Sequence, residues 1–189
     1  MYLFLDTETG GIGLDKSLLT ASFVFTDRNF QIKEELNLSL IPDDGIYRVT
    51  PEGMEVNKIN LCELAKGALT YKKAGTELYR FLQKCYSRNS GNKIVPVGHG
   101  MSGDLDHLFD KLLNRLSWEN HVSYRRLDTS TLAQYLKMIG YIPEGVSGSL
   151  SSLAEYFNLN INEGDLHTAR GDVGLIIEVV KCLSRLRVV

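Results

Sequence analysis

Carboxylates stand at three widely separated places in this sequence, and carboxylates that converge in space can bind divalent metal ions. The amino-terminal stretch MYLFLDTETGG carries two of them, Asp6 and Glu8, directly after the apolar residues 1–5. In an extended chain, side chains two residues apart point to the same side, so these carboxylates would lie together while Thr7 and Thr9 point away. This stretch alone does not separate a functional site from a solvated strand end.

A further carboxylate, Asp172, falls at the start of an expected carboxyl-terminal helix over residues 171–185. At 100° per residue it shares a face with the apolar Ile176 and Val179, where an unpaired carboxylate is costly to bury. The alternative is an ordinary acidic residue in a first helical turn, which the helix dipole favours. His167 lies five residues earlier, on the loop that would enter this helix. An isolated histidine is more often a surface or core residue than a catalyst.

Asp104 would open the helix that follows the fourth strand, again a common position for an acidic residue. Asp106 and Asp110 lie close by. The helical angle does not separate the three, because Asp104 and Asp106 both fall near the edges of the leucine-rich face. Periodicity therefore leaves the choice between them open.

Composition and charge describe an ordinary globular chain. Its 189 residues suit one domain over 1–189, and the contents of 43% hydrophobic and 23% charged residues are typical. Without a membrane-length apolar stretch or a signal-peptide start, we expect a soluble cytoplasmic protein with no membrane partner. Cys62, Cys85 and Cys182 form no CxxC pair, which favours reduced thiols over disulfides or zinc. The net charge of −2 disfavours a broad basic face for long nucleic acids, though not a local site.

Alternating and helical apolar patterns predict the elements that must position these acids. An early meander of three strands gives way to strands that alternate with helices, which implies a mixed sheet with helices on its faces. The expected strands cover 1–5, 18–26, 30–41, 93–98 and 124–128, with a turn at 27–29. The expected helices cover 51–56, 74–86, one continuous segment from Leu105 to Leu116, 132–139, 150–157 closed by a left-handed Asn158, and 171–185.

Taken in order, the acidic stretches resemble the three motifs of the DEDDh (DnaQ-like) 3′-5′ exonucleases. DTETGG matches at Asp6 and Glu8, GHGMSGDLDHL at Asp104, and HTARGD at His167 and Asp172. One such motif is weak support, but three in order within a matching element pattern make chance agreement improbable. Between them, VTPEGMEVNKINL, RRLDTSTLA and SLSSLAEYFNL are similar to further family segments. The resemblance covers nearly the whole chain and is closest in wording to bacterial and phage members.

The resemblance implies an α/β, ribonuclease H-like fold with a five-stranded mixed sheet flanked by helices on both faces. It implies two ions of Mg²⁺ or Mn²⁺, which prefer oxygen ligands. Asp6, Glu8 and Asp172 would hold the ion that activates water, Asp6 and Asp104 the second ion, and His167 would take the water proton. The expected substrate-binding residues are Thr7, Thr9 and His99.

The implied reaction is hydrolysis of the terminal phosphodiester at a 3′ end of DNA or RNA, which releases nucleoside 5′-monophosphates. The implied partners are single-stranded nucleic-acid 3′ ends, and a homodimer is compatible with the resemblance. Two pairs of basic residues are candidate phosphate contacts, although each pair equally suits a solvated face. They are Lys72 with Lys73, and Arg125 with Arg126.

With a net charge of −2, the chain is expected to contact few phosphates. The logarithm of its binding constant should then fall with the logarithm of salt concentration at a slope well below the ~10 of proteins with wide phosphate contacts. Fluorescence-anisotropy titration of a single-stranded oligonucleotide at several salt concentrations measures this slope. A slope near ten would contradict the expectation.

The middle motif departs from the family pattern H-N-x-x-F-D. Gly100 stands where the Asn is usual and Gly103 where the Phe is usual, so the choice of Asp104 depends on its spacing from His99. A catalytically silent nucleic-acid-binding module on the same fold is the alternative function. Adhesion through the tripeptide 170–172 is disfavoured, because a secretion signal is missing and the tripeptide would pack into a helix start.

Overall fold

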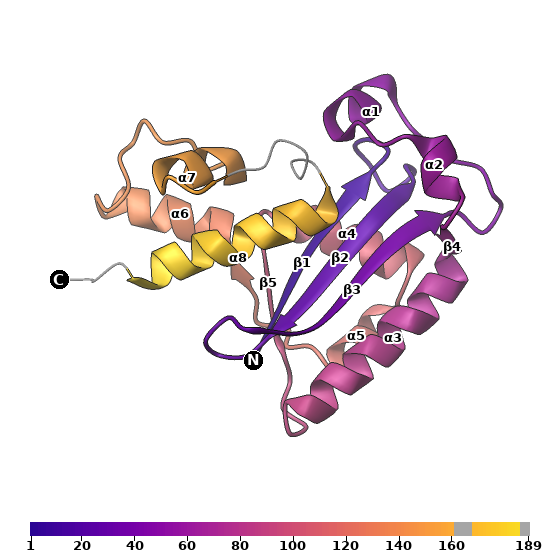
Figure 1. Cartoon of the computed structure of the whole chain (residues 1–189), viewed down its shortest axis with the longest axis horizontal. Helices are drawn as coiled ribbons and strands as arrows, with labels where there is room; N and C mark the ends of the chain where they lie inside the picture. Colours follow the sequence, from indigo (N-terminus) through magenta and orange to yellow (C-terminus); the bar gives the residue numbers. More distant parts are fainter. Residues whose placement is uncertain (161–167, 186–189) are drawn as a thin grey trace.

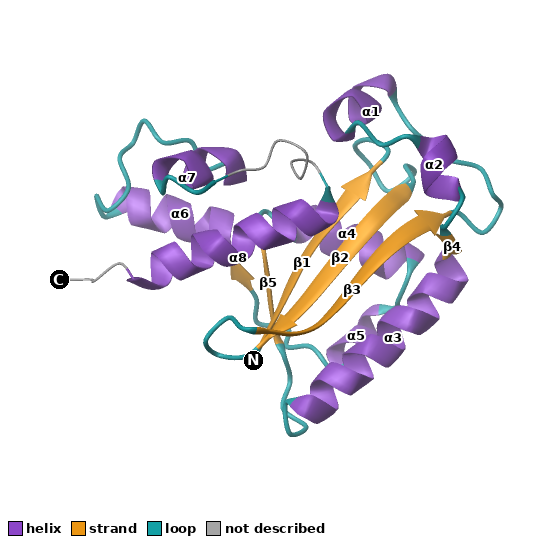
Figure 2. Ribbon diagram, viewed as in Figure 1, coloured by secondary structure: helices purple, strands orange, loops and turns teal. Residues whose placement is uncertain are grey.

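A six-stranded mixed sheet lies at the centre of the molecule (Figures 1 and 2). The computed structural model describes residues 1–160 and 168–185. Strand order is β4-β3-β2-β1-β5-β6; β2 runs antiparallel to β1 and β3, and the other neighbours pair in parallel. The strands are β1 Tyr2–Thr9, β2 Leu18–Thr26, β3 Ile32–Ile41, β4 Leu69–Thr70, β5 Val95–Gly98 and β6 Leu127–Asp128.

Helices cover both faces of this sheet (Figure 2). The apolar sides of α3, α4 and α5 pack on one face, and that of α8 packs on the other. A third apolar cluster joins α6 and α7 to the far half of α8. The helices are α1 Pro51–Asn57, α2 Leu61–Ala65, α3 Tyr71–Arg88, α4 Ser102–Lys111, α5 Arg115–Glu119, α6 Thr129–Met138, α7 Leu150–Tyr156 and α8 Ala169–Arg185.

The central strand β1 sends alternate side chains into the two layers. Leu3 and Leu5 are fully buried in the cluster with α3 and α4, whereas Phe4 is fully buried in the cluster with α8. Burial on both faces explains why the strand begins as a continuous apolar run rather than an alternating one. By the same alternation, the side chains of Asp6 and Glu8 point to the face covered by α8, and that of Thr7 points to the face covered by α4.

Helix α1 packs directly on the turn that follows β1. Thr50, the N-cap of α1, donates its backbone N–H to the carbonyl of Gly10 at 2.7 Å. A Cβ on Gly53 would lie only 2.6 Å from that same carbonyl oxygen, so a larger residue would push the helix away. The buried Asn57 at the end of α1 donates from its side chain to the carbonyl of Thr9 at 2.9 Å. These contacts fix α1 beside the end of the central strand.

The predicted mixed sheet with helices on both faces is confirmed, but the predicted number of five strands was wrong. The strand that was not predicted, β4, has two residues, which is too short to carry a periodic pattern. The first strand does not end at residue 5, because β2 pairs with β1 as far as Thr9. The fifth expected strand, 124–128, shortens to the two residues of β6. Asn158 is left-handed as expected, with φ of 52°.

The single helix expected from Leu105 to Leu116 is also wrong. Two helices, α4 and α5, occupy that stretch, and Leu116 is 77% exposed. Asn114 caps the second helix by accepting the backbone N–H of Ser117 at 2.9 Å. The chain between the helices passes so close to α3 that a Cβ on Gly75 would lie 2.1 Å from the carbonyl oxygen of Leu112. In the part of the chain that the structure describes, no helix is long and apolar enough to cross a membrane.

Candidate active site

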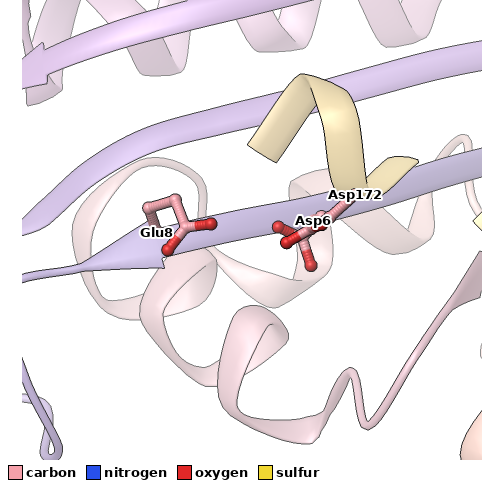
Figure 3. A group of neighbouring side chains, drawn as sticks. All are labelled: Asp6, Glu8 and Asp172. Carbon is pink, nitrogen blue, oxygen red and sulfur yellow. The ribbon is translucent and has the colours of Figure 1, made fainter. Parts of the chain in front are cut away.

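Three carboxylates meet on the α8 side of β1 (Figure 3). One oxygen each from Asp6, Glu8 and Asp172 lies within 4.8 Å of the others. Asp6 and Glu8 come from alternate positions of β1, and Asp172 comes from the start of α8. Thr168 caps that helix by accepting the backbone N–H of Gly171 at 3.0 Å, and the buried residues of α8 hold it on the sheet. Strand alternation and helix packing thus bring these distant acids together.

Asp104 approaches the same strand end from the α4 side. Its Oδ1 accepts the backbone N–H of Thr7 at 3.1 Å and the hydroxyl of Thr7 at 2.6 Å. Strand β5 pairs with β1 only over Tyr2–Phe4, so the β1 edge beyond Phe4 has no strand partner there. The Asp104 carboxylate supplies that missing acceptor, and backbone N–H groups near a buried core need one. Thr7 therefore orients a carboxylate.

Of the three acidic residues of α4 that the sequence left open, the structure places only Asp104 at this strand end. Asp106 and Asp110 are exposed, and Asp110 pairs with Lys111 at 2.6 Å. Thr9 donates its hydroxyl to the carbonyl of Gly11 at 3.0 Å. His167 lies outside the described residues.

Burial and neighbouring carboxylates raise the pKa values of the acids at this strand end. Burial raises the pKa of Asp6 well above its usual range, and the charges of Asp104, Asp172 and Glu8 raise it further. Burial, then Asp172 and Asp104, raise the pKa of Glu8 to about 7. Burial also raises the pKa of Asp104 to about 6, against the lowering effect of its hydrogen bonds from Thr7. Neighbouring like charges that share a partly buried site favour protonation unless a cation compensates them.

The donor set fits hard divalent cations. The clustered ligand atoms are all carboxylate oxygens, from Asp6, Glu8 and Asp172, with no cysteine or histidine of the described residues among them. Oxygen-only sites suit Mg²⁺ and Mn²⁺, whereas structural zinc sites use Cys and His. A bound cation would also relieve the mutual repulsion that raises these pKa values.

Asp128, at the end of β6, holds the turn that precedes α4, the helix that carries Asp104. Its carboxylate accepts the backbone N–H groups of Gly100 and Met101, each at 3.0 Å, in the turn that leads to α4. The same carboxylate caps α6 by accepting the backbone N–H groups of Ser130 at 3.0 Å and Thr131 at 3.4 Å. This role of Asp128 is not among those predicted from the sequence, although an Asp before Thr-Ser-Thr is a helix-cap signature.

Asp128→Ala is expected to destabilise the fold by about 2–4 kcal/mol, because it removes a helix cap and leaves two turn N–H groups without an acceptor. For a chain of this length the melting temperature should fall by roughly 5–12 °C. Thermal unfolding followed by circular dichroism measures it. Asp128→Asn, which keeps one acceptor oxygen, should lose less than half as much; an unchanged melting temperature in Asp128→Ala would show that the carboxylate does not tie the two segments together.

His99 contacts the start of α6 rather than the carboxylates. The Thr129 hydroxyl oxygen lies 2.9 Å from His99 Nδ1, and the hydroxyl donates to the carbonyl of Gly98 at 3.1 Å. Burial lowers the pKa of His99 and keeps the ring neutral. These contacts give His99 a structural connection to α6.

A cleft of about 410 Å³ opens beside the carboxylates. Its walls are the end of β1, the loop 11–13, helix α1 and the segment 100–107, and Glu8 and Asp104 line it. Its volume is in the range of small-ligand sites. Among the basic candidates, Arg126 reaches the first turn of α4, with its guanidinium 3.4 Å from the hydroxyl of Ser102. Arg125 lies over the exposed ring of Tyr124.

Comparison with known proteins identifies the fold. No family model matches the chain, and no curated protein matches its sequence. Solved structures of exonuclease I do match. The Escherichia coli enzyme with a dT13 oligonucleotide has a TM-score of 0.74 at 18% identity, over 97% of this chain and 41% of that one. The chain has a ribonuclease H-like fold.

Two further exonuclease I structures agree. The zinc-bound E. coli complex with single-stranded DNA has a TM-score of 0.73 at 19% identity, and a structure bearing on processivity has 0.73 at 18%. Each covers 97% of this chain and 40% of the other. The chain thus spans about two fifths of the length of these neighbours, and identities this low establish the fold alone.

Proposed function

We propose that this chain is a divalent-metal-dependent 3′-5′ exonuclease that acts on single-stranded nucleic acid and releases nucleoside 5′-monophosphates. One observation carries the proposal. Four carboxylates from three distant segments, Asp6, Glu8, Asp104 and Asp172, converge around the end of one strand. Structural needs alone do not explain this convergence, because it costs the metal-free fold free energy through burial and repulsion.

Each carboxylate has a distinct place in the proposed reaction. Two divalent ions bound there would stabilise the attacking and leaving oxygens of an in-line phosphoryl displacement. Asp6, Glu8 and Asp172 would hold the ion on the side of the attacking water. Asp6 and Asp104 would hold the ion on the leaving-group side, with Asp104 oriented by Thr7. His167, five residues before Asp172 in the sequence, is proposed as the general base, a role suited to an imidazole.

Single-stranded ends are the proposed substrate because the cleft beside the carboxylates is small and the chain carries no excess of positive charge. A duplex would need a broad basic surface along its phosphates. Two of the exonuclease I neighbours were solved with single-stranded DNA, which agrees with this choice. Bound cations would supply much of the attraction for the phosphate that the side chains do not.

The test is a hydrolysis assay with the wild-type chain, Mg²⁺ or Mn²⁺, and a single-stranded oligonucleotide labelled at its 5′ end. A 3′-5′ exonuclease shortens the labelled strand one nucleotide at a time and releases monophosphates. Circular single-stranded DNA, which has no end, should remain intact. Asp172→Asn is the matched control, because it keeps the side-chain shape and removes one charged ligand.

The outcomes separate this proposal from its alternative. A ladder of products that requires metal and disappears in Asp172→Asn supports the exonuclease. Oligonucleotide binding without hydrolysis in either metal would support a silent binding module on the same fold. Cleavage of the circular substrate would instead indicate an endonuclease. Parallel reactions with RNA and with mismatched duplex ends define the preferred substrate.

A further inference from the structure

Helix α4 presents a second polar side chain, His107, to the cleft one helical turn beyond Asp104. The imidazole is only 6% exposed. Its Nδ1 is buried and has no hydrogen-bond partner among the described residues. A buried polar atom without a partner costs free energy and calls for an explanation beyond packing, since a phenylalanine would fill the same space without that cost.

The unpartnered nitrogen determines which tautomer the ring adopts. A buried N–H without an acceptor is less favourable than a bare ring nitrogen, so the proton of the neutral imidazole belongs on Nε2. Burial lowers the pKa of His107, which keeps the ring neutral. Nε2–H is then the one donor of the ring, and His107 is a lining residue of the cleft.

Two glycines line the same cleft as this ring. A Cβ at Gly100 or at Gly103 would meet no atom within 4 Å, so each position has room for a larger residue. In the exonuclease motif that the sequence resembles, an Asn and a Phe occupy these positions. Side chains of that size would reduce the space that His107 lines here.

The same cleft is also lined by exposed apolar residues. Ile12 is 99% exposed and Val56 is 60% exposed, and both line the cleft. Aliphatic side chains together with one polar donor suit a nucleobase, which has apolar faces and a polar edge. One turn of α4, about 5 Å, separates His107 from Asp104, so a phosphate at the carboxylates would leave the attached nucleoside next to His107.

We propose that His107 is a specificity residue whose Nε2–H donates a hydrogen bond to the base edge of the 3′-terminal nucleotide, in a space that Gly100 and Gly103 leave open. This inference depends on the proposed exonuclease function. It adds to that function a base contact that the carboxylate cluster does not provide.

The test compares His107→Phe, which keeps the ring and removes the donor, with His107→Gln, which keeps a donor. Each is assayed on an oligonucleotide with a normal 3′-terminal nucleotide and on one whose terminal nucleotide lacks its base. His107→Phe should lower kcat/KM about tenfold on the normal substrate and leave kcat/KM on the abasic substrate unchanged, as expected for one lost hydrogen bond. His107→Gln should recover most of the loss.

A matched control is His121→Phe, which alters another buried histidine, packed between Tyr79 and Tyr86 away from the cleft. It should change kcat/KM on both substrates by the same factor. If His107→Phe also lowers both values equally, the role of His107 is structural and the inference is overturned.

Failure of the proposed function is distinguishable from failure of this inference. A wild-type chain that hydrolyses neither substrate overturns the exonuclease. Calorimetric titration with thymidine 5′-monophosphate and Mg²⁺ then tests the base contact by itself. Weaker binding by His107→Phe than by wild type would support the contact, and equal or absent binding would overturn it.

Discussion

Asp6→Asn is expected to reduce hydrolysis of a single-stranded oligonucleotide by at least ~10³-fold while making the metal-free protein more stable. The loss of activity follows from removing the one carboxylate proposed to touch both metal ions, since metal stabilisation of the transition state contributes several kcal/mol. The gain in stability follows because the pKa of Asp6 is raised by burial and by its three carboxylate neighbours. An amide relieves that repulsion.

The size of the stabilisation can be bounded. In EDTA at pH 8, relief of desolvation and repulsion at a partly buried carboxylate should contribute about 1–3 kcal/mol. This corresponds to a rise in melting temperature of roughly 3–8 °C for a chain of this length. Differential scanning calorimetry measures it. Asp106→Asn, an exposed carboxylate on α4, should leave both stability and hydrolysis nearly unchanged. A lower melting temperature for Asp6→Asn would mean that the cluster is not repulsive.

Mg²⁺ or Mn²⁺ is expected to stabilise the wild-type chain strongly at pH 8 and weakly at pH 5.5. The pKa values of Glu8, about 7, and Asp104, about 6, lie above the ordinary carboxyl range. Protonation of these two carboxylates therefore stabilises the metal-free fold fully below about pH 4. This contribution is lost as the pH rises through 6 to 7. Metal binding requires the deprotonated forms, so protons compete with the metal over the same interval.

At a metal concentration of 100 times the dissociation constant, binding adds about 2.7 kcal/mol. The melting temperature at pH 8 should then rise by roughly 5–10 °C, and at pH 5.5 by less than about 2 °C. Thermal shift titrations at both pH values make the measurement. Asp172→Asn is the control, because it lacks one ligand and should show a reduced shift at pH 8. An equal shift at the two pH values would place the metal away from this cluster.

The alternation of side chains along a strand correctly predicted how Asp6 and Glu8 lie relative to each other. The spacing of Asp6 and Glu8 put both carboxylates on one side of a strand, and the structure places them so. The apolar face of the last helix likewise indicated that Asp172 turns inward, toward the sheet. These inferences worked because a period of two or 3.6 residues is a local property of the backbone.

The position of Asp104 could not be predicted from periodicity, because it depends on a long-range mismatch of strand lengths. β5 pairs with β1 only as far as Phe4, and this leaves the Thr7 N–H for the Asp104 carboxylate. No feature of the α4 sequence indicates that β1 lacks a strand partner at this point. The split between α4 and α5 was missed for a similar reason, since the close approach of Leu112 to Gly75 is a tertiary contact.

The central strand contributes to both layers, with its carboxylates facing α8 and Thr7 facing α4. A one-residue insertion between Phe4 and Asp6 would therefore invert the parity of every later position and send the acids and the hydroxyl to opposite layers at once. By contrast, lengthening the exposed hairpin turn at 27–29 leaves that parity intact. Engineered or natural length variation should accordingly accumulate in the hairpin and be absent from the first strand.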